Sequence, residues 1–449
     1  MTTKSSRRKF VATAISGAVA SIVAPKTLAG NLPEQTESAP TIINGNVSAQ
    51  KAADTGPKRV APSEFIIFPW GGMPDYPADA TWGEIGGDIS DVNSMMKDLY
   101  NCGFNTSGFT NVKNLKHARN NHLMGMLFSG INITHETTQE EADRTIKTLV
   151  ESITDPEDRK AVYTIYLKDE PKVAMFPQLN IFSEAVRKQN VLPYINLFPN
   201  YASPYELGSK DYIEHLDKYV EICKPPYISY DNYSLYDGGR LDEDRFYSNI
   251  ELIRNKSLQA GIPFWNIILG NAHFNYAEPS DATLAIQVYS TLAYGGKGIG
   301  YFTFYTPQVG NYRLAPIDRF GYRTKTWEMM RNINLQIHSL VSVYGKLKSV
   351  NVFHTGTVPR NAQGIDSAKL VESVKGDSLL VGEFTDTAGK PYTMVVNKNI
   401  HSSVAFDVQF KQKGRIMIIS QFDQGMVNFT GEQRWLAPGC GMLLTVESP

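Results

Sequence analysis

An acidic pair followed directly by proline is the stretch of this sequence whose residue types point most clearly to chemistry. The apolar segment that begins at Tyr163 ends in Asp169, Glu170 and Pro171. Pro171 ends the strand, because proline has no N–H for the ladder and restricts the residue before it. The pattern therefore predicts two carboxylates at the C-terminal end of a buried strand, and in a barrel such carboxylates are the groups that hydrolyse glycosidic bonds.

Three carboxylates receive different expected roles. Glu170 is the first candidate for a general acid/base, because burial against aromatic walls raises the pKa of a carboxyl group. Asp231 ends a later strand and is the best candidate for a second catalytic carboxylate. Asp169 is expected to orient a sugar hydroxyl or an N-acetyl group, or to hold Glu170 in place.

Polar and aromatic side chains at the other strand ends are expected to surround these carboxylates. A sugar site needs amides and hydroxyls for the sugar hydroxyl groups, and aromatic rings for the apolar sugar faces. The expected substrate contacts are Trp70, Asn105, Asn196, Asn200, Tyr233, Asn271, His273 and Tyr305.

The elements that position these residues follow a strand–helix rhythm, which is typical of βα units. Amphipathic helical patterns separate the apolar segments, and eight such units in one run indicate a closed (β/α)8 TIM barrel rather than an open sheet. The expected strands are 65–70, 104–109, 123–128, 162–168, 192–197, 227–230, 264–269 and 299–304.

Beyond a long expected helix at 323–344, the hydrophobic period changes to two. Short alternating segments between turn signals predict a small antiparallel β-sandwich packed on the barrel. The expected domains are the barrel at 61–350 and the sandwich at 351–449. The expected sandwich strands are 379–384, 392–397, 404–410, 415–419 and 441–446.

The N-terminal segment carries an export pattern. Arg7 and Arg8 precede a mild apolar stretch, and small residues follow at 27–29. Residues 1–29 are therefore interpreted as a twin-arginine signal peptide, and the polar residues 30–60 as a flexible linker. The expected location is periplasmic or secreted, with no membrane anchor after cleavage.

Composition narrows the expected partners. The chain has 44 Lys and Arg against 45 Asp and Glu, without a basic cluster beyond the N-terminus, which argues against a nucleic-acid surface. The three cysteines, Cys102, Cys223 and Cys440, are too widely spaced for a zinc motif. The expected partner is an oligosaccharide or polysaccharide, with no metal and no cofactor.

At Asp169-Glu170-Pro171 the chain resembles the (β/α)8 glycoside hydrolases of clan A, and most of all the exported family-42-like proteins with a barrel and a β-sandwich. Their motif is Asn-Glu-Pro or a variant. The resemblance implies an acid/base at Glu170 and a hydroxyl-binding role for Asp169. The chain departs from the clan after the seventh strand, where the segment from Asn266 to His273 has no carboxylate. Glu278, further on, is expected to be a charge at a helix N-terminus.

A second resemblance fits this departure. Barrel hexosaminidases that use the substrate's own N-acetyl group carry an adjacent Asp-Glu pair, which implies that Asp169 polarises the acetamido group. A third arrangement pairs Glu170 with Asp231, and a carboxyl separation of about 5 Å indicates retention while about 6.5–9.5 Å indicates inversion. The sequence thus predicts an exported hydrolase of O-glycosidic bonds, with a substrate-assisted hexosaminidase-type barrel and a non-catalytic carbohydrate-binding barrel as alternatives.

Overall fold

A computed structural model of the chain describes residues 58–71, 91–128, 130–308 and 310–447. The expected signal peptide at 1–29 lies outside these residues, as does nearly all of the expected linker at 30–60.

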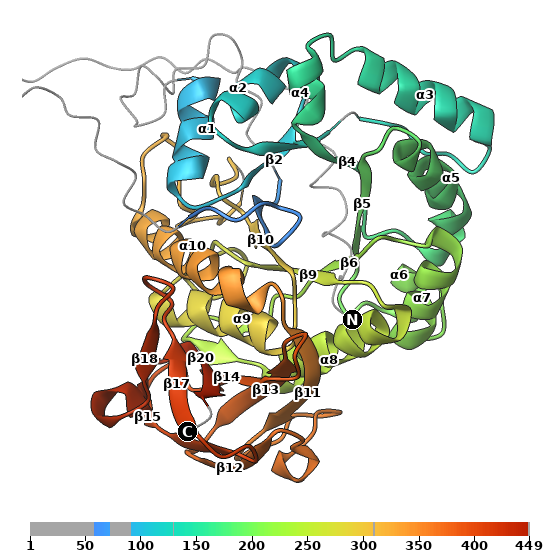
Figure 1. Ribbon diagram of the computed structural model, residues 1–449. Helices are drawn as coiled ribbons and strands as arrows, with labels where there is room; N and C mark the ends of the chain where they lie inside the picture. Colours follow the sequence, from blue (N-terminus) through green and yellow to red (C-terminus); the bar gives the residue numbers. More distant parts are fainter. Residues whose placement is uncertain (1–57, 72–90, 129, 309, 448–449) are drawn as a thin grey trace, which may run out of the picture. The chain divides into compact units, whose positions relative to one another are not determined.

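Eight parallel strands form one sheet in the order β1-β10-β9-β6-β5-β4-β3-β2, and helices follow one another around them (Figure 1). Each expected strand is present within a few residues of its expected bounds, so the predicted barrel is confirmed. The strands are β1 (Ile66–Pro69), β2 (Thr106–Thr110), β3 (Met124–Leu127), β4 (Val162–Asp169), β5 (Leu192–Leu197), β6 (Ile228–Asp231), β9 (Phe264–Leu269) and β10 (Gly298–Phe302).

Eight of the ten helices in the described residues begin at a side chain that caps the first turn. The α9 helix, for example, begins at a capping box in which Ser280 and Thr283 bond each other's backbone N–H groups. The helices are α1 (Val92–Asn101), α2 (Leu115–Asn120), α3 (Gln139–Glu151), α4 (Pro156–Lys160), α5 (Phe176–Arg187), α6 (Pro204–Leu207), α7 (Tyr212–Lys218), α8 (Glu243–Ala260), α9 (Asp281–Ala293) and α10 (Lys325–Tyr344). Shorter turns are η1 (Val112–Asn114), η2 (Val173–Met175), η3 (Tyr219–Cys223), η4 (Ile365–Ser367) and η5 (Gly431–Arg434).

The barrel closes between β1 and β2 through one amide side chain. The backbone N–H of Asn105 donates to the carbonyl oxygen of Ile67 at 3.2 Å, and the Asn105 Oδ1 accepts from the Ile67 N–H at 2.8 Å. The Asn105 Nδ2 donates to the carbonyl oxygens of Val60 and Phe65. Asn105 precedes β2, so it lies at the opposite end of the strand from the expected site.

Aromatic side chains fill the interior of the barrel. Phe68, Tyr194 and Trp265 pack together with ring centroids 5.8 to 6.1 Å apart. β10 makes room for them, because a Cβ on Gly300 would lie 2.6 Å from the Phe68 ring and one on Gly298 would lie 2.7 Å from Trp265. This layer fills the barrel interior, so the barrel is a packed core and not a pore.

The C-terminal region consists of antiparallel sheets, as expected. A six-stranded sheet has the order β11-β13-β14-β20-β17-β18, and β12–β16 and β15–β19 form two small ladders. The strands are β11 (Lys348–His354), β12 (Val371–Lys375), β13 (Leu379–Thr385), β14 (Pro391–Asn397), β15 (Val404–Ala405), β16 (Asp407–Phe410), β17 (Arg415–Ile419), β18 (Met426–Asn428), β19 (Trp435–Leu436) and β20 (Gly441–Glu447). The strand expected at 404–410 is thus two strands in different ladders.

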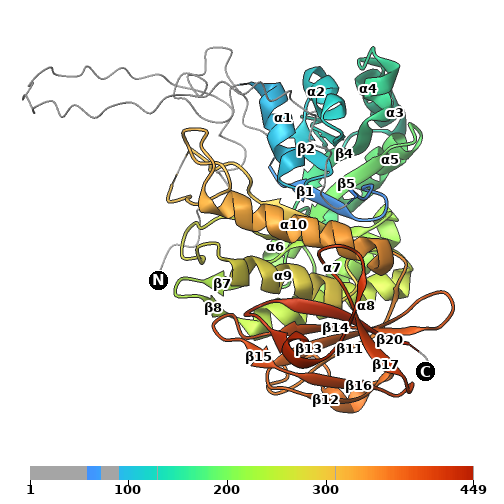
Figure 2. The same ribbon diagram turned by 60° about the vertical axis from the view of Figure 1, so that its left-hand side comes forward.

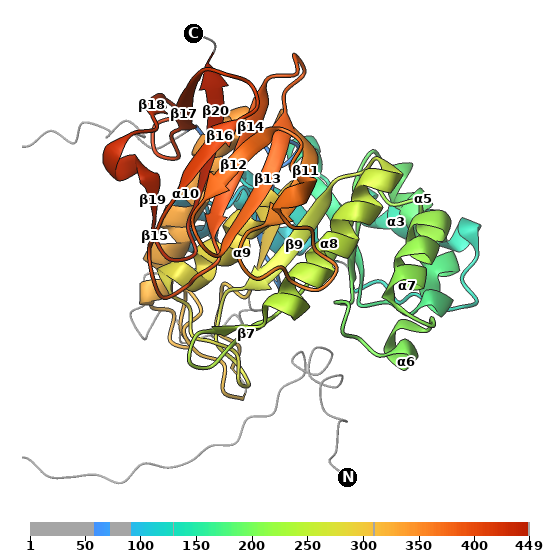
Figure 3. The ribbon, with the colours of Figure 1, turned by 90° about the horizontal axis from the view of Figure 1, so that it is seen from below.

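The six-stranded sheet packs against the helices that cover the last part of the barrel. It lies beside α9 and α10 in two views (Figure 2; Figure 3). Contact with α9 is close, because a Cβ on Gly382 would lie 2.1 Å from the carbonyl oxygen of Ala293. Leu380 and Met394 of the sheet share one hydrophobic core with Leu292 of α9. β11 crosses residue 350, where the expected domains meet.

Candidate active site

Three neighbouring strands deliver the site to the C-terminal mouth. Asp169 is the last residue of β4 and pairs in register with Asn196 of β5. Asn196 pairs in register with Ser229 of β6, two residues before Asp231. Since side chains two residues apart share a face of a strand, Ser229 and Asp231 both point into the barrel. The predicted gathering of Asp169, Asn196 and Asp231 at one end of the barrel is therefore present.

One amide joins two of the carboxylates. The Nδ2 of Asn196 donates to the Oδ1 of Asp169 at 3.1 Å and to the Oδ1 of Asp231 at 2.9 Å. Because one nitrogen reaches both oxygens, the two Oδ1 atoms lie no more than about 6 Å apart, the sum of these two distances. Asn196 is 1% exposed. Its two N–H bonds are used on protein carboxylates, so its observed role is to hold them, and not the sugar contact that the sequence suggested.

A hydrogen-bond chain inside the barrel fixes the orientation of this amide. The Oγ of Ser229 donates to the Oδ1 of Asn196 at 3.0 Å, and the Tyr194 hydroxyl lies 3.1 Å from the same Oγ. Since the Ser229 proton is directed to Asn196, Tyr194 is the donor in the second bond. Each bond polarises the next, so the chain strengthens the grip of Asn196 on both carboxylates.

The electrostatic surroundings leave Asp169 able to take up a proton near neutral pH. Burial is the main cause that raises the pKa of Asp169 to about 6, while the Asn196 bond and the charge of Lys168 oppose the rise. A carboxyl group with this pKa changes its charge within the working pH range of most enzymes.

Tyr233 lies within reach of the charges of the acidic cluster. Burial raises the pKa of Tyr233 well above its ordinary value, and the charge of Asp231 raises it further, followed by smaller effects of Asp169 and Glu170. The pKa of Tyr201 is also raised, mainly by burial and then by the charge of Asp231. The charges of all three carboxylates thus reach Tyr233, the charge of Asp231 also reaches Tyr201, and Tyr201 is a site residue that sequence reasoning missed.

The backbone of Glu170 adopts a left-handed conformation with φ +46°, and its N–H donates to the carbonyl oxygen of Asn196 at 2.8 Å. Few residues other than glycine, asparagine and aspartate adopt such angles, and residues that do so cluster at functional sites. The conformation turns the chain sharply between Asp169 and Pro171.

Aromatic rings form one wall of the mouth. His273 is 3% exposed and stacks on Tyr312, with ring centroids 4.8 Å apart and planes 8° apart. Phe302 lies 5.4 Å from His273, 5.6 Å from Tyr233 and 5.5 Å from Trp70. Trp70, Tyr233 and His273 thus lie together around Phe302, at the end of the barrel where they were expected. Tyr312 had no sequence signal, because it lies in the long loop after β10.

Several expected substrate contacts are engaged in holding the barrel ends together. Asn271 is buried, donates through Nδ2 to the Oγ1 of Thr303 at 2.8 Å and accepts through Oδ1 from the Nδ1 of His273 at 3.0 Å. Asn200 donates through Nδ2 to the Oγ of Ser248 on α8. Tyr305 is 6% exposed and packs edge-on against Phe304. These three side chains and Asn105 contact other parts of the barrel, so they are not part of the proposed site.

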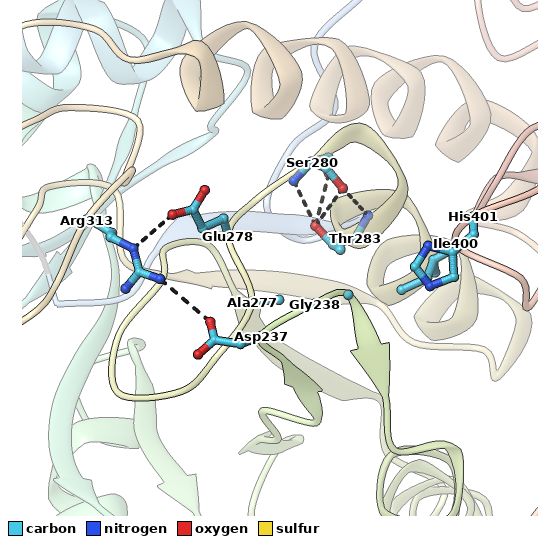
Figure 4. A pocket seen from close by; sticks show the side chains of 10 residues that line it. Asp237, Gly238, Ala277, Glu278, Ser280, Thr283, Arg313, Ile400 and His401 are labelled. Atoms are coloured by element: carbon cyan, nitrogen blue, oxygen red, sulfur yellow. Dashed lines mark hydrogen bonds and ion pairs between the residues drawn. The ribbon is translucent and has the colours of Figure 1, made fainter.

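The loop after β9 brings Glu278 to a different place. Its Oε1 accepts from the Nε of Arg313 at 3.0 Å, and the Arg313 guanidinium also lies 3.7 Å from the Oδ1 of Asp237. Figure 4 shows this ion-pair triad at one side of a cavity of about 360 Å³, with His401 at the other side. Glu278 lies before the first turn of α9 and points toward Arg313.

Within the described residues, no group of three or more His, Cys, Asp or Glu side chains is arranged to hold a metal ion. Over the same part of the chain, no helix is both long enough and apolar enough to cross a membrane. Cys102, Cys223 and Cys440 are unpaired thiols, and the first two are buried.

Comparison with known proteins finds structural likeness only. No protein-family model and no curated protein sequence matches the chain. A family 39 glycoside hydrolase from Bacteroides cellulosilyticus is 12% identical over 87% of this chain and 83% of its own, with a TM-score of 0.49. A GH27 β-L-arabinopyranosidase from Geobacillus stearothermophilus is 11% identical over 86% and 98%, with a TM-score of 0.44. A β-galactosidase from Marinomonas ef1 is 9% identical over 62% and 60%, with a TM-score of 0.42. Similarity at this level does not bear on activity.

Proposed function

We propose that this protein is an exported glycoside hydrolase that cleaves an O-glycosidic bond at the C-terminal mouth of its barrel. The observation that carries the proposal is the acidic cluster: one nitrogen of Asn196 holds Asp169 and Asp231, Glu170 follows Asp169 directly, and the charges of all three carboxylates reach Tyr233. Paired carboxylates among aromatic walls are the equipment of glycosidic hydrolysis.

In the proposed reaction Glu170 protonates the glycosidic oxygen while the bond from the anomeric carbon to that oxygen breaks. Asp231 faces the positive charge that develops at the anomeric carbon, either as a nucleophile or as the base that activates water. Water supplies the new hydroxyl at the anomeric carbon, and its second proton restores the acid. Asp169 stands beside Glu170 and shares the Asn196 amide with Asp231.

Large exposed aromatics support a carbohydrate ligand at this mouth. Phe128 follows β3 at 38% exposure, Tyr205 follows β5 at 76%, and Phe274 follows β9 at 51%. Phe128 and Phe274 lie on loops, and Tyr205 lies in the short helix α6; each of these segments follows the C-terminal end of a barrel strand. Exposed aromatic faces at a site rim provide the apolar surfaces on which sugar rings stack.

The substrate-assisted reading is the second candidate, and it is favoured by two observations. Asp169 and Glu170 are adjacent at one strand end, and the segment that follows β9 up to His273 contains no carboxylate. In this reaction the acetamido oxygen of the substrate attacks the anomeric carbon, and Asp169 polarises that group. Asp169→Asn should then reduce hydrolysis of 2-acetamido substrates much more than that of 2-hydroxy substrates.

The test of the proposal is a product assay with the mature protein on a panel of neutral, N-acetylated and uronate-containing oligosaccharides. Glu170→Gln should abolish turnover on any substrate found, with an unchanged melting temperature, because the amide keeps the shape and cannot deliver a proton. Glu136→Gln, at an exposed loop position, is the matched control. Turnover by Glu170→Gln at the wild-type rate would remove Glu170 from its role. Binding of a glycan in calorimetry without any product would identify a non-catalytic carbohydrate-binding barrel instead.

A further inference from the structure

A cavity lies where loops of the barrel mouth meet the C-terminal sheets. It has a volume of about 360 Å³, in the range of small-molecule sites. Four chain segments build it: the turn between β7 (Leu235–Tyr236) and β8 (Arg240–Leu241), the loop before α9, the loop after β10 and the loop after β14. Its lining includes Asp237, Gly239, Glu278, Arg313, Ile400 and His401 (Figure 4).

Two short routes connect this cavity with the acidic cluster. The rings of Tyr233 and Tyr276 lie 5.8 Å apart, and Ala277 of the cavity follows Tyr276 directly. On the other route His273 stacks on Tyr312, and Arg313 of the cavity follows Tyr312. Two residues that line the cavity are therefore direct neighbours in the chain of two residues in the aromatic wall.

The polar groups in the cavity suit the hydroxyl groups of a sugar. Arg313 uses its Nε on Glu278 at 3.0 Å, one terminal nitrogen on the Asn311 carbonyl oxygen at 3.4 Å and the other toward Asp237 at 3.7 Å. A guanidinium has five N–H bonds, so two remain to donate to a ligand, and the carboxylates beside it have lone pairs to accept. These groups are 38 to 59% exposed. Exposed ion pairs contribute little to stability, so these groups can form hydrogen bonds with a ligand at little cost to the fold.

The charge balance selects the class of ligand. The single positive charge of Arg313 lies between two carboxylates, those of Glu278 and Asp237, so negative charge is in excess. A sugar that carried a carboxylate or sulfate group would meet two negative charges there, and like charges are repelled. An uncharged sugar unit meets only hydrogen-bonding groups.

The C-terminal sheets contribute His401 to this cavity. The imidazole lies against the backbone of Gly239, such that a Cβ on this glycine would be 3.0 Å from the ring. Gly239 has φ +71°, a conformation that favours glycine, and the turn thereby leaves room for the ring. The structure thus places a ring from the C-terminal region at the rim of the barrel mouth.

We propose that this cavity, lined by Arg313, Glu278, Asp237 and His401, is an additional subsite that binds an uncharged sugar unit next to the one that is cleaved. This inference rests on the proposed glycoside hydrolase activity. It implies that the enzyme acts on neutral oligosaccharides of three or more units better than on short substrates. It also gives the C-terminal sheets a direct part in substrate binding.

Chain-length dependence tests the subsite. Hydrolysis is measured on neutral gluco-, galacto-, xylo- and N-acetylated oligosaccharides of two to five units and on the matching 4-nitrophenyl monoglycosides. Binding of the same oligosaccharides is measured by calorimetry in the Glu170→Gln variant. Arg313→Met should raise KM and Kd for tri- to pentasaccharides by about tenfold, as expected for one lost hydrogen bond to a charged group, and His401→Ala should raise them by about threefold, as expected for an ordinary hydrogen bond. The monoglycosides should change by less than twofold. Arg415→Met, which breaks an exposed ion pair in β17, is the matched control.

The outcomes separate the subsite from the activity. If oligosaccharides are cleaved but neither affinity nor KM depends on chain length or on Arg313 and His401, the subsite is wrong and the activity stands. If nothing is cleaved, the activity is wrong, and calorimetry still decides the subsite: affinity that grows with length and falls in Arg313→Met supports it, and unaltered or absent binding overturns it. Tighter binding of uronate-containing oligosaccharides would overturn the proposed ligand class.

Discussion

Glu383 of β13 and Asp169 of β4 are both strand carboxylates inside the fold, yet their partners differ in kind. The Glu383 oxygens accept from the backbone N–H groups of Lys369, Leu370 and Val371 at 2.6 to 3.1 Å, and from the Nδ2 of Asn351 at 2.9 Å. Asp169 accepts from a side-chain amide that it shares with Asp231. Backbone donors hold the carboxylate oxygens of Glu383 in place, whereas burial raises the pKa of Asp169 to about 6.

The difference shows how one residue type serves structure in one region and chemistry in another. Glu383 is 0% exposed and ties β11 and the segment before β12 to β13, so its charge is compensated by donors that cannot move away. At the barrel mouth, Asp169 and Asp231 share one amide, and Asp169 can take up a proton near pH 6. Four predictions test this contrast, from the largest expected effect to the smallest.

The largest expected effect follows from removing the charge of Asp231 at the barrel mouth. Asp231→Asn keeps an oxygen that can accept from Asn196, so the fold should be retained. We expect kcat/KM to fall by about 10²- to 10⁴-fold, because no other group takes over the charge at the anomeric carbon. Asp366→Asn, at an exposed position in η4, is the control. Comparable rates for the two variants would place the second catalytic carboxylate elsewhere.

The same type of change in the C-terminal sheets should affect stability instead. In Glu383→Gln one of the two accepting oxygens becomes an NH2 group, which faces backbone N–H donors and cannot accept from them. The substitution also removes the negative charge that strengthens the remaining hydrogen bonds. We expect the free energy of unfolding to fall by about 2–4 kcal/mol, with activity per folded molecule retained at low temperature. Denaturant titration measures the loss. Glu372→Gln, whose partner Lys413 is exposed, should cost little, and an equal loss there would remove the special role of Glu383.

The titration of Asp169 sharpens the contrast. Its folded-state pKa of about 6 lies above the unfolded value, so its contribution to stability is present at low pH and is lost as pH rises through about 6. Asp169→Asn does not titrate and keeps an oxygen for Asn196. As pH rises from 4.5 to 7.5, the melting temperature of this variant should therefore increase relative to that of the wild type. A constant difference across this range would mean that Asp169 does not titrate there.

The smallest expected effect concerns the backbone of Glu170. A left-handed conformation costs residues with a Cβ about 1–2 kcal/mol, and glycine adopts it freely. Glu170→Gly should therefore be about 1 kcal/mol more stable than Glu170→Ala, while both lack activity. Equal stability of the two variants would show that φ +46° at this position costs nothing.

Much of the barrel and part of the site followed from local patterns. Apolar segments placed eight strands correctly, since strand length and flanking turns are local properties. The end of β4 was placed well because Pro171 marks it. Asn105 was assigned to the wrong end of its strand, because an amide at a strand boundary looks the same in sequence whether it contacts a ligand or closes the barrel. β11, β12, β18 and β19 were missed, since their pairing depends on neighbours that are distant in sequence.

The sequence by itself determined which chemical groups this chain carries and the end of the barrel at which most of them lie, because strand direction fixes where each strand ends. Only the tertiary structure decided how these groups are used. It turned Asn196 from an expected sugar contact into the amide that holds Asp169 and Asp231, because β5 lies between β4 and β6. It also brought Arg313 to Glu278 and Asp237, since the loops after three different strands meet only when the barrel closes. Hydrogen-bond partners and pKa shifts depend on such distances in space, which spacing along the chain does not contain.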